Sequence, residues 1–356
     1  MRVDQLVPTF HRGDAIGDEA YHIKQFLQKN GFHSEIYCLE RDQGLETQSR
    51  LWAEFTQPQP SDVTIFHFAL PSPLTEKFIQ LPSWKILIYH NITPEHFFRP
   101  YSAEMAHIAR VGREEVKLMA SRVDIALADS EYNRQELAEL GYQRTDVFPL
   151  FIDFQKYERP PDRFFQQLFQ DGRVNLLFVG RIVPNKRLDD LIRIVFYYKK
   201  YISPLVRLII VGKTTSLPAY YKSLIKLVDD FYLRPEEVVF TGHITDEQMY
   251  ALYRTADVFL SMSEHEGFGL PLVESMIFDL PVVAYAAAAV PYTLGGAGVL
   301  LHTKRVDLVA ELIDLIVHQE EIKRKIVQGQ RARIEKLRSE GLEAKLLRII
   351  KELGGS

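Results

Sequence analysis

Short apolar runs alternate with helix-like stretches along most of this chain, and the alternation limits the folds available to it. In the first half the apolar runs are rich in β-branched and aromatic residues, as parallel strands buried on both faces are: DVTIFHFAL, WKILIYHN, VDIALADS and TDVFPLF. Helix-like stretches such as Glu19 to Lys29 and Glu131 to Leu140 are each followed by a stop that contains glycine. The pattern predicts an α/β fold of doubly wound parallel sheets.

Two domains suit a chain of 356 residues, because single cores rarely grow beyond about 250–300 residues. The alternation is interrupted at Tyr157 to Phe165, YERPPDRFF, and starts again at VNLLFVG. We therefore expect a Rossmann-like first domain over residues 1–160 and a Rossmann-like second domain over residues 170–330. A helical tail over residues 331–356 is expected to pack back on the first domain.

The charge balance excludes some classes of function. Lys and Arg total 43 against 47 Asp and Glu, a formal net charge of -4, so the basic excess of a nucleic-acid-binding protein is missing. The single cysteine, Cys38, forms no intrachain disulfide. The first residues lack the apolar run of a signal peptide, so we expect a cytoplasmic protein. Basic residues between 322 and 353 are typical either of a solvated helix face or of a peripheral contact with an anionic membrane.

The stretch EHEGFGLPLVESM places two carboxylates around a glycine-containing turn. It follows a strand-like run, and Pro271 suits the first turn of a helix. N–H groups at a helix start attract anions, and Gly267 and Gly269 let a phosphate come close to the backbone. Glu266 and Glu274 then flank the anion and accept hydrogen bonds from hydroxyls. This describes a nucleotide sugar; the alternative is a helix whose acidic residues only serve its dipole.

A second polar stretch, GRIVPNKR, directly follows the strand-like VNLLFVG. A diphosphate leaving group needs a metal ion or fixed cations to stabilise its growing charge. The chain contains no Asp-x-Asp, and its two Asp-Asp pairs fall in expected helices. We therefore expect Arg181 and Lys186 to take this role, with no metal and no cofactor.

The stretches EGFGLPLVE, GRIVPNK and TGHITDEQMYALYRTADVFLSMS together resemble the donor half of the retaining glycosyltransferases of family four. That family has the GT-B fold, in which two Rossmann-like domains face a central cleft. The resemblance covers most of residues 174–320. It implies that Glu266 contacts the sugar or the reacting centre, that Glu274 binds the ribose hydroxyls, and that Arg181 and Lys186 hold the diphosphate. It also implies that further residues bind the donor: Gly267, Phe268, Gly269, Leu270, His243 and Ile244.

The first half resembles the family more loosely. Its first strand is followed by HRGDAIGDE where relatives usually have a double-glycine loop, and we expect Gly13, Gly17 and Asp18 to close over the phosphates. His90 follows the strand-like KILIY, at the place where the family often has an active-site histidine. His67 and His96 lack that placement and are interpreted as packing or surface residues.

The resemblance implies a metal-independent hexosyltransferase that retains the configuration of the sugar. The expected donor is a nucleotide-diphosphate sugar, with GDP-mannose favoured because EGFGLPLVES is similar to bacterial mannosyltransferases. The expected acceptor is a hydroxyl of a glycan or lipid-linked precursor bound by the first domain, and domain closure is expected to bring His90 over the donor. The alternatives are a nucleotide-sugar epimerase of similar fold and a non-catalytic two-domain protein that binds sugar.

Overall fold

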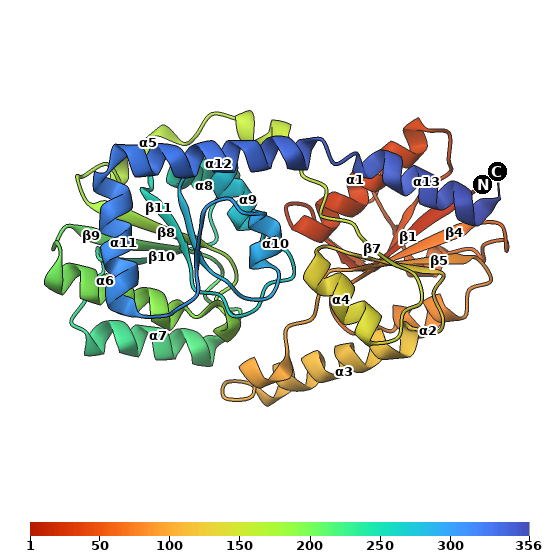
Figure 1. The fold of residues 1–356 in the computed structure, drawn as a ribbon. Coiled ribbons are helices and arrows are strands. Elements are labelled where there is room, and N and C mark those ends of the chain that lie inside the picture. Colours follow the sequence, from red (N-terminus) through yellow and green to blue (C-terminus); the bar gives the residue numbers. More distant parts are fainter. Residues whose placement is uncertain (356) are drawn as a thin grey trace. The chain divides into compact units, whose positions relative to one another are not determined.

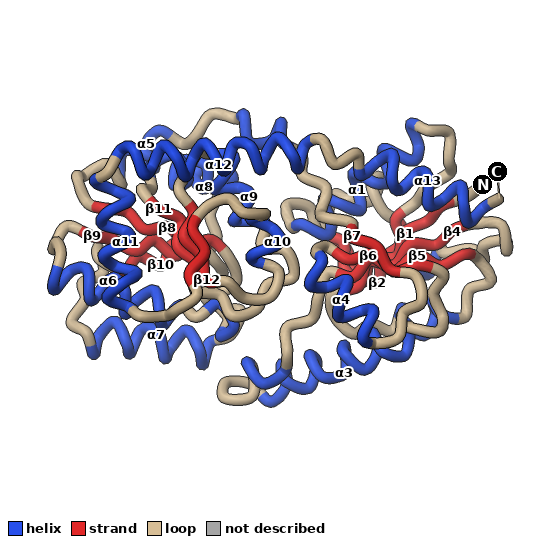
Figure 2. The backbone as a smooth tube through the Cα atoms, in the orientation of Figure 1, coloured by secondary structure: helices blue, strands red, loops and turns tan. Residues whose placement is uncertain are grey.

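The computed structural model describes residues 1–355 and consists of two compact units (Figure 1). The first unit comprises residues 1–95 and 104–152 and the chain from Glu340 onward, whereas the second comprises residues 96–103 and 153–339. Each unit is built around one parallel sheet (Figure 2). The prediction of two Rossmann-like α/β domains is confirmed.

The first domain has a seven-stranded sheet in the order β3-β2-β1-β4-β5-β6-β7, with all neighbours parallel. Its first six strands follow the order 3-2-1-4-5-6 of dinucleotide-binding sheets, which places the topological switch point between β1 and β4. The strands are β1 (Val3–Phe10), β2 (Ile36–Arg41), β3 (Arg50–Leu51), β4 (Val63–Phe68), β5 (Trp84–Tyr89), β6 (Ile125–Ala128) and β7 (Thr145–Val147). The helices are α1 (Ala15–Lys29), α2 (Leu74–Ile79), α3 (Ala103–Met119), α4 (Glu131–Glu139) and α13 (Leu342–Gly354).

The second domain repeats this order with six parallel strands, β10-β9-β8-β11-β12-β13. Its switch point therefore lies between β8 and β11. The strands are β8 (Val174–Val179), β9 (Val206–Val211), β10 (Val238–Gly242), β11 (Val258–Ser261), β12 (Val282–Tyr285) and β13 (Val299–Leu301). The helices are α5 (Arg163–Leu168), α6 (Leu188–Tyr201), α7 (Pro218–Asp230), α8 (Asp246–Thr255), α9 (Leu270–Ile277), α10 (Val290–Leu294), α11 (Val306–His318) and α12 (Glu320–Arg338).

The first helix begins earlier than its pattern indicated. The Asp14 carboxylate caps α1 by accepting hydrogen bonds from the N–H groups of Ile16 (2.8 Å) and Gly17 (3.0 Å). Helix α1 therefore starts at Ala15, and the loop expected over HRGDAIGDE ends at the cap. Gly17 and Asp18 lie in the first helical turn, so placing them in a loop was wrong.

The end of the chain completes the core of the first domain. Helix α13 packs Leu346, Ile349, Ile350 and Leu353 into the cluster that holds strand residues such as Val63. Helix α12 belongs to the second unit, so the tail expected over residues 331–356 is divided near residue 340. The division between the units also falls at residues 152 and 153, before the interruption that marked it in the sequence.

Candidate active site

Both polar motifs follow the two strands that flank the switch point of the second sheet. Strands β8 and β11 are hydrogen-bonded neighbours, and ligands of such sheets bind outside the carboxyl ends of these strands. The buried side chain of Asn185 joins the two loops, because its amide N–H₂ donates to the carbonyl of His265 at 2.9 Å. The N–H of Glu264 donates in turn to the carbonyl of Asn185 at 2.8 Å. The two motifs therefore form one continuous surface.

Lys186 and Glu266 meet on this surface. The Lys186 Nζ donates to Glu266 Oε2 at 2.6 Å, and the two side chains are 15% and 14% exposed. The motif cation and the motif carboxylate are thus paired with each other. A phosphate that approaches Lys186 meets an ammonium whose position Glu266 has already fixed.

Arg187 and Lys304 organise the loops around this pair, and the sequence motifs did not single them out. Arg187 adopts a left-handed conformation, with φ of 51°, at the start of α6. Its guanidinium donates to Asp189 at 2.9 Å and to Glu264 at 2.7 Å. The hydrogen bond to Asp189 and the charges of Asp189, Asp190 and Glu264 raise the pKa of this guanidinium above the usual value. The Lys304 Nζ donates to Asp190 at 2.9 Å and to Glu264 at 2.7 Å. The aspartates at the start of α6 are therefore ion-paired.

The turn between Glu266 and α9 has the backbone that an anion site needs. Gly269 is the residue before the helix and has φ of 85°, a conformation that side chains other than glycine rarely adopt. Pro271 lies in the first turn of α9. The buried Phe268 is held by a hydrogen bond from Thr293 to its carbonyl. Leu270 offers the first N–H of α9, whereas Pro271 has none and the N–H of Leu272 donates to the Gly269 carbonyl at 2.9 Å. The positive end of the helix dipole at this place favours a negatively charged ligand.

Glu274 lies one turn inside α9, as expected, and two tyrosines bind its carboxylate. Tyr157 donates to Oε1 at 2.9 Å and Tyr253 donates to Oε2 at 2.8 Å. Burial and the adjacent carboxylate raise the pKa of both phenols well above the usual value, so both remain donors. Glu274 is 5% exposed. Each carboxylate oxygen already accepts one hydrogen bond and can accept another. Binding of ribose hydroxyls by Glu274 stays a prediction.

The remaining donor-side residues lie at carboxyl ends of strands. Arg181 follows β8, its side chain is exposed, and its guanidinium has no hydrogen bond or ion pair within residues 1–355. Partial loss of hydration lowers the pKa of this guanidinium. The exposed His243 and the half-buried Ile244 follow β10, between Gly242 and the capping residue of α8. All three are placed where a ligand of this sheet edge could reach them.

The first-domain residues are engaged with one another. The Asp18 carboxylate accepts from the N–H of Gly13 at 3.1 Å and from Arg12 Nε at 2.7 Å. Gly17 lies against His11, where an added Cβ would stand 1.7 Å from the carbonyl oxygen. His90 follows β5, its side chain is 3% exposed, and its Nδ1 lies 3.1 Å from an Asp129 oxygen. Closure of Gly13, Gly17 and Asp18 over phosphates stays a prediction.

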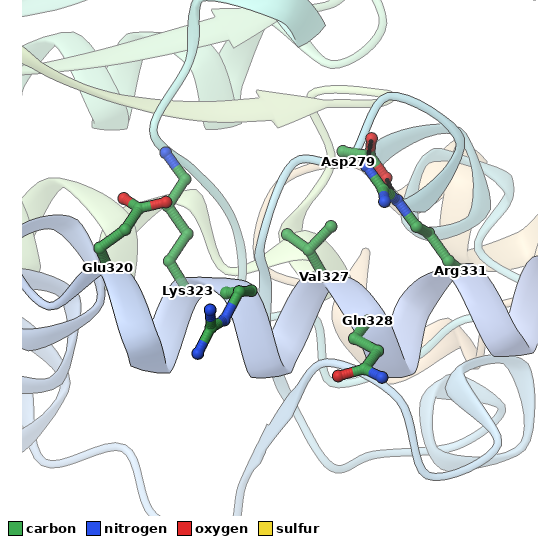
Figure 3. A pocket seen from close by; sticks show the side chains of 7 residues that line it. Asp279, Glu320, Lys323, Val327, Gln328 and Arg331 are labelled. Atoms are coloured by element: carbon green, nitrogen blue, oxygen red, sulfur yellow. Dashed lines mark hydrogen bonds and ion pairs between the residues drawn. The ribbon is translucent and has the colours of Figure 1, made fainter.

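A groove along α12 holds part of the basic tail (Figure 3). Lys323 and Arg331 line it together with acidic residues, and Arg331 donates to Asp279 at 2.6 Å. The groove is therefore of mixed charge and is not a specific anion site. Among residues 1–355, no helix has both the length and the apolar character that crossing a bilayer requires.

Known proteins place these motifs in a family. Residues 161–333 match the family model described as glycosyl transferases group 1. Residues 161–333 form a group 1 glycosyltransferase domain. The serotype-specific mannosyltransferase WbdA of Escherichia coli is 24% identical over 65% of this chain and 26% of its own. The D-inositol 3-phosphate glycosyltransferase of Mycolicibacterium smegmatis is 30% identical over 57% of this chain and 48% of its own. The chain thus matches between a quarter and a half of the length of these two relatives.

Similarity to solved structures extends over 99% of the chain. HepE from Anabaena, solved with UDP and glucose, has a TM-score of 0.76 with 18% identity over 99% of this chain and 100% of its own. Sucrose-phosphate synthase from Thermosynechococcus elongatus has the same TM-score of 0.76 with 17% identity over 99% of both chains. At these identities the likeness shows the fold, and it includes the first domain, whose motifs depart most from the family pattern.

Proposed function

We propose that this group 1 glycosyltransferase moves a hexose from a nucleotide-diphosphate sugar to a hydroxyl of a glycan or lipid-linked acceptor. The observation that carries the proposal is the joined surface at the β8–β11 switch point. There an ammonium, a carboxylate and a helix N-terminus lie within one pair of loops. Such a combination offers cations for a diphosphate and a hydrogen-bond acceptor for sugar hydroxyls.

In the proposed reaction the diphosphate binds at the start of α9, next to Arg181 and Lys186. The bond between the anomeric carbon and the phosphate oxygen breaks, and these cations stabilise the departing nucleoside diphosphate. The acceptor hydroxyl forms the new bond on the same face of the sugar, and its proton passes to the departing phosphate. Glu266 contacts the sugar and keeps Lys186 in place. The reaction needs no metal and retains the anomeric configuration.

We favour GDP-mannose as the donor. The WbdA proteins, which are 24% identical to this chain, are named mannosyltransferases. HepE, which was solved with UDP-glucose, is only 18% identical to this chain. Both bases are therefore included in the test. We propose a peripheral contact with a membrane only for the case in which the acceptor is linked to a lipid.

The test is a thermal-shift and donor-hydrolysis panel in the presence of a metal chelator. It covers GDP-mannose, UDP-glucose, UDP-GlcNAc and UDP-galactose with their nucleoside diphosphates. We expect stabilisation by one donor, lost in Lys186→Ala and Glu274→Ala and kept in Lys325→Ala, whose side chain is 71% exposed. The anomeric configuration of the product, read by NMR, then tests retention.

Other results identify the alternatives. Stabilisation by free sugars alone would indicate a sugar-binding protein, and interconversion of donors without an acceptor would indicate an epimerase. Silence of a folded protein across the whole panel would refute the proposed site.

A further inference from the structure

Five polar side chains form a closed cluster near the carboxyl edge of the first sheet. They come from five different elements, and all are almost fully buried: Gln5 of β1, Glu19 of α1, His67 of β4, His90 after β5 and Asp129 after β6. Buried polar groups are expensive unless they are hydrogen-bonded, so the directions of their hydrogen bonds define their protonation states. His67, which the sequence did not distinguish from a packing residue, lies at the centre of this cluster.

The direction of the chain of hydrogen bonds is set at Gln5. Its amide nitrogen donates to the carbonyl of Ala20 at 3.0 Å, which leaves the amide oxygen facing His67 Nε2, also at 3.0 Å. An amide oxygen can only accept, so the proton of this contact belongs to His67 Nε2. If His67 is neutral, its Nδ1 is then an acceptor, and it lies 3.2 Å from His90 Nε2.

The positive charge of the pair belongs on His90. Its Nδ1 lies 3.1 and 3.2 Å from the two oxygens of Asp129, and its Nε2 lies 3.5 Å from Glu19. A charge on His67 would face only Glu19, at 3.6 Å. Burial lowers the pKa of His67. Burial also lowers the pKa of His90, but Asp129, Glu19 and the helix-capping Asp14 raise it overall to about 9.

The imidazole rings of His67 and His90 are oriented for a direct hydrogen bond between them. Their planes differ by 5° and their centroids are 5.4 Å apart, while the facing nitrogens are 3.2 Å apart. The centroid separation exceeds the nitrogen separation by about two ring radii, so each nitrogen points straight at the other. To bind one metal ion together with Glu19, His67 Nδ1 and His90 Nε2 would both have to direct their lone pairs at a point beside the line that joins the two nitrogens. The rings are therefore oriented for a hydrogen bond from His90 to His67.

We propose that Gln5 and His67 are positioning residues that hold His90 as a buried imidazolium, so that His90 does not act as a proton acceptor in the reaction. Both ring nitrogens of His90 carry protons in this arrangement, so no lone pair is free for an acceptor hydroxyl. Asp129 and Glu19 balance the charge of this imidazolium, and its two N–H groups already donate to Asp129 and His67, so the ring acts by fixing its neighbours at the carboxyl edge of the sheet and not by contacting a substrate. The catalytic part of this inference rests on the proposed function, but the protonation pattern does not.

The first test reads protonation directly and needs neither donor nor acceptor. Long-range ¹H–¹⁵N spectra of the full chain labelled in histidine are recorded from pH 5 to pH 10, and the signals are assigned with His67→Gln and His90→Gln. We expect His90 to be doubly protonated at pH 7 and to titrate near pH 9, and His67 to be neutral with its proton on Nε2. A neutral His90 or a doubly protonated His67 at pH 7 would overturn the proposal.

Variants of the chain of hydrogen bonds sharpen the result. Asp129→Asn should lower the pKa of His90 by at least one unit. Gln5→Leu should abolish the preference of His67 for Nε2–H, whereas Gln5→Glu keeps an acceptor and should preserve it. Zn²⁺ added alone should leave both signals in place; stoichiometric perturbation of both would assign a metal site here instead.

The pH profile of kcat/KM then tests the role in catalysis. We expect that the wild-type profile has no limb between pH 6 and pH 8 that arises from His90, so any limb in this range should remain in His90→Gln. A limb near the ordinary histidine pKa of about 6.5 that disappears in this variant would show that His90 is a base. If the unmutated chain transfers no sugar but gives the expected spectra, the proposed function is refuted and the protonation pattern is still supported.

Discussion

Breaking the ion pair of Lys186 and Glu266 from either side should lower stability, but the two variants should change diphosphate binding in opposite directions. At 2.6 Å two unit charges attract by about 6 kcal/mol at an effective dielectric constant of about 20. Desolvation offsets most of this, because the side chains are only 15% and 14% exposed. We expect a net coupling free energy of about 1–2 kcal/mol between the two residues.

Urea unfolding of Lys186→Met, Glu266→Gln and the double variant measures this coupling. Arg331 and Asp279 provide the matched control, because they pair at the same 2.6 Å with side chains 68% and 42% exposed. Their coupling free energy should stay below about 0.5 kcal/mol. Equal couplings for the two pairs would show that burial of the Lys186 pair contributes nothing.

Binding separates the two residues further. Lys186→Met should weaken binding of the nucleoside diphosphate by at least 10-fold, about 1.4 kcal/mol, and leave binding of the nucleoside unchanged. Glu266→Gln frees the ammonium from its partner and should strengthen diphosphate binding by up to about 10-fold, while turnover falls. Calorimetric titration measures both. If Lys186→Met weakens the nucleoside and the diphosphate equally, Lys186 does not hold the phosphates.

Three further results follow from the structure. Tyr253→Phe removes a donor to the buried Glu274 carboxylate and should lower the free energy of unfolding by about 2 kcal/mol, whereas Tyr232→Phe, at an 88% exposed side chain, should change nothing in the same urea titration. Gly17→Ala would place its Cβ 1.7 Å from the His11 carbonyl oxygen and should cost at least about 2 kcal/mol; Gly329→Ala, with open space around it in α12, should be neutral or stabilising by up to about 1 kcal/mol. The pKa of His90 is raised from 6.5 to about 9 in the folded chain. This shift contributes about 3 kcal/mol of stability, fully present below pH 6.5 and lost as the pH rises through 9. Unfolding titrations at several pH values should show a smaller loss of stability with pH in His90→Gln.

Local patterns carried the fold and part of the site. Buried parallel strands leave continuous apolar runs, so β4, β5 and β6 were visible as DVTIFHFAL, WKILIYHN and VDIALADS. The motifs around Lys186 and Glu266 were visible because each follows directly on such a run. The start of α1 was missed because a cap at Asp14 overrides the weak helical preference of Gly17.

Residues that act across long sequence separations could not be found in this way. Tyr157 reaches Glu274 over 117 positions, and Gln5 reaches His67 over 62. No local signal distinguishes such a tyrosine or glutamine from a packing residue, because the partner is chosen by the packing of the folded domain. The mutual pairing of Lys186 with Glu266 over 80 positions was hidden for the same reason.

Helix α13 is synthesised after the second domain, although it completes the core of the first domain. Four apolar side chains of α13, Leu346, Ile349, Ile350 and Leu353, belong to the same cluster as Val3 at the other end of the chain. Ribosomes add roughly 5–20 residues per second, so part of the apolar face of the first domain stays uncovered while the second domain is translated. Because exposed apolar surface promotes aggregation, an early stop codon anywhere in the second domain should lead to aggregation of the first domain.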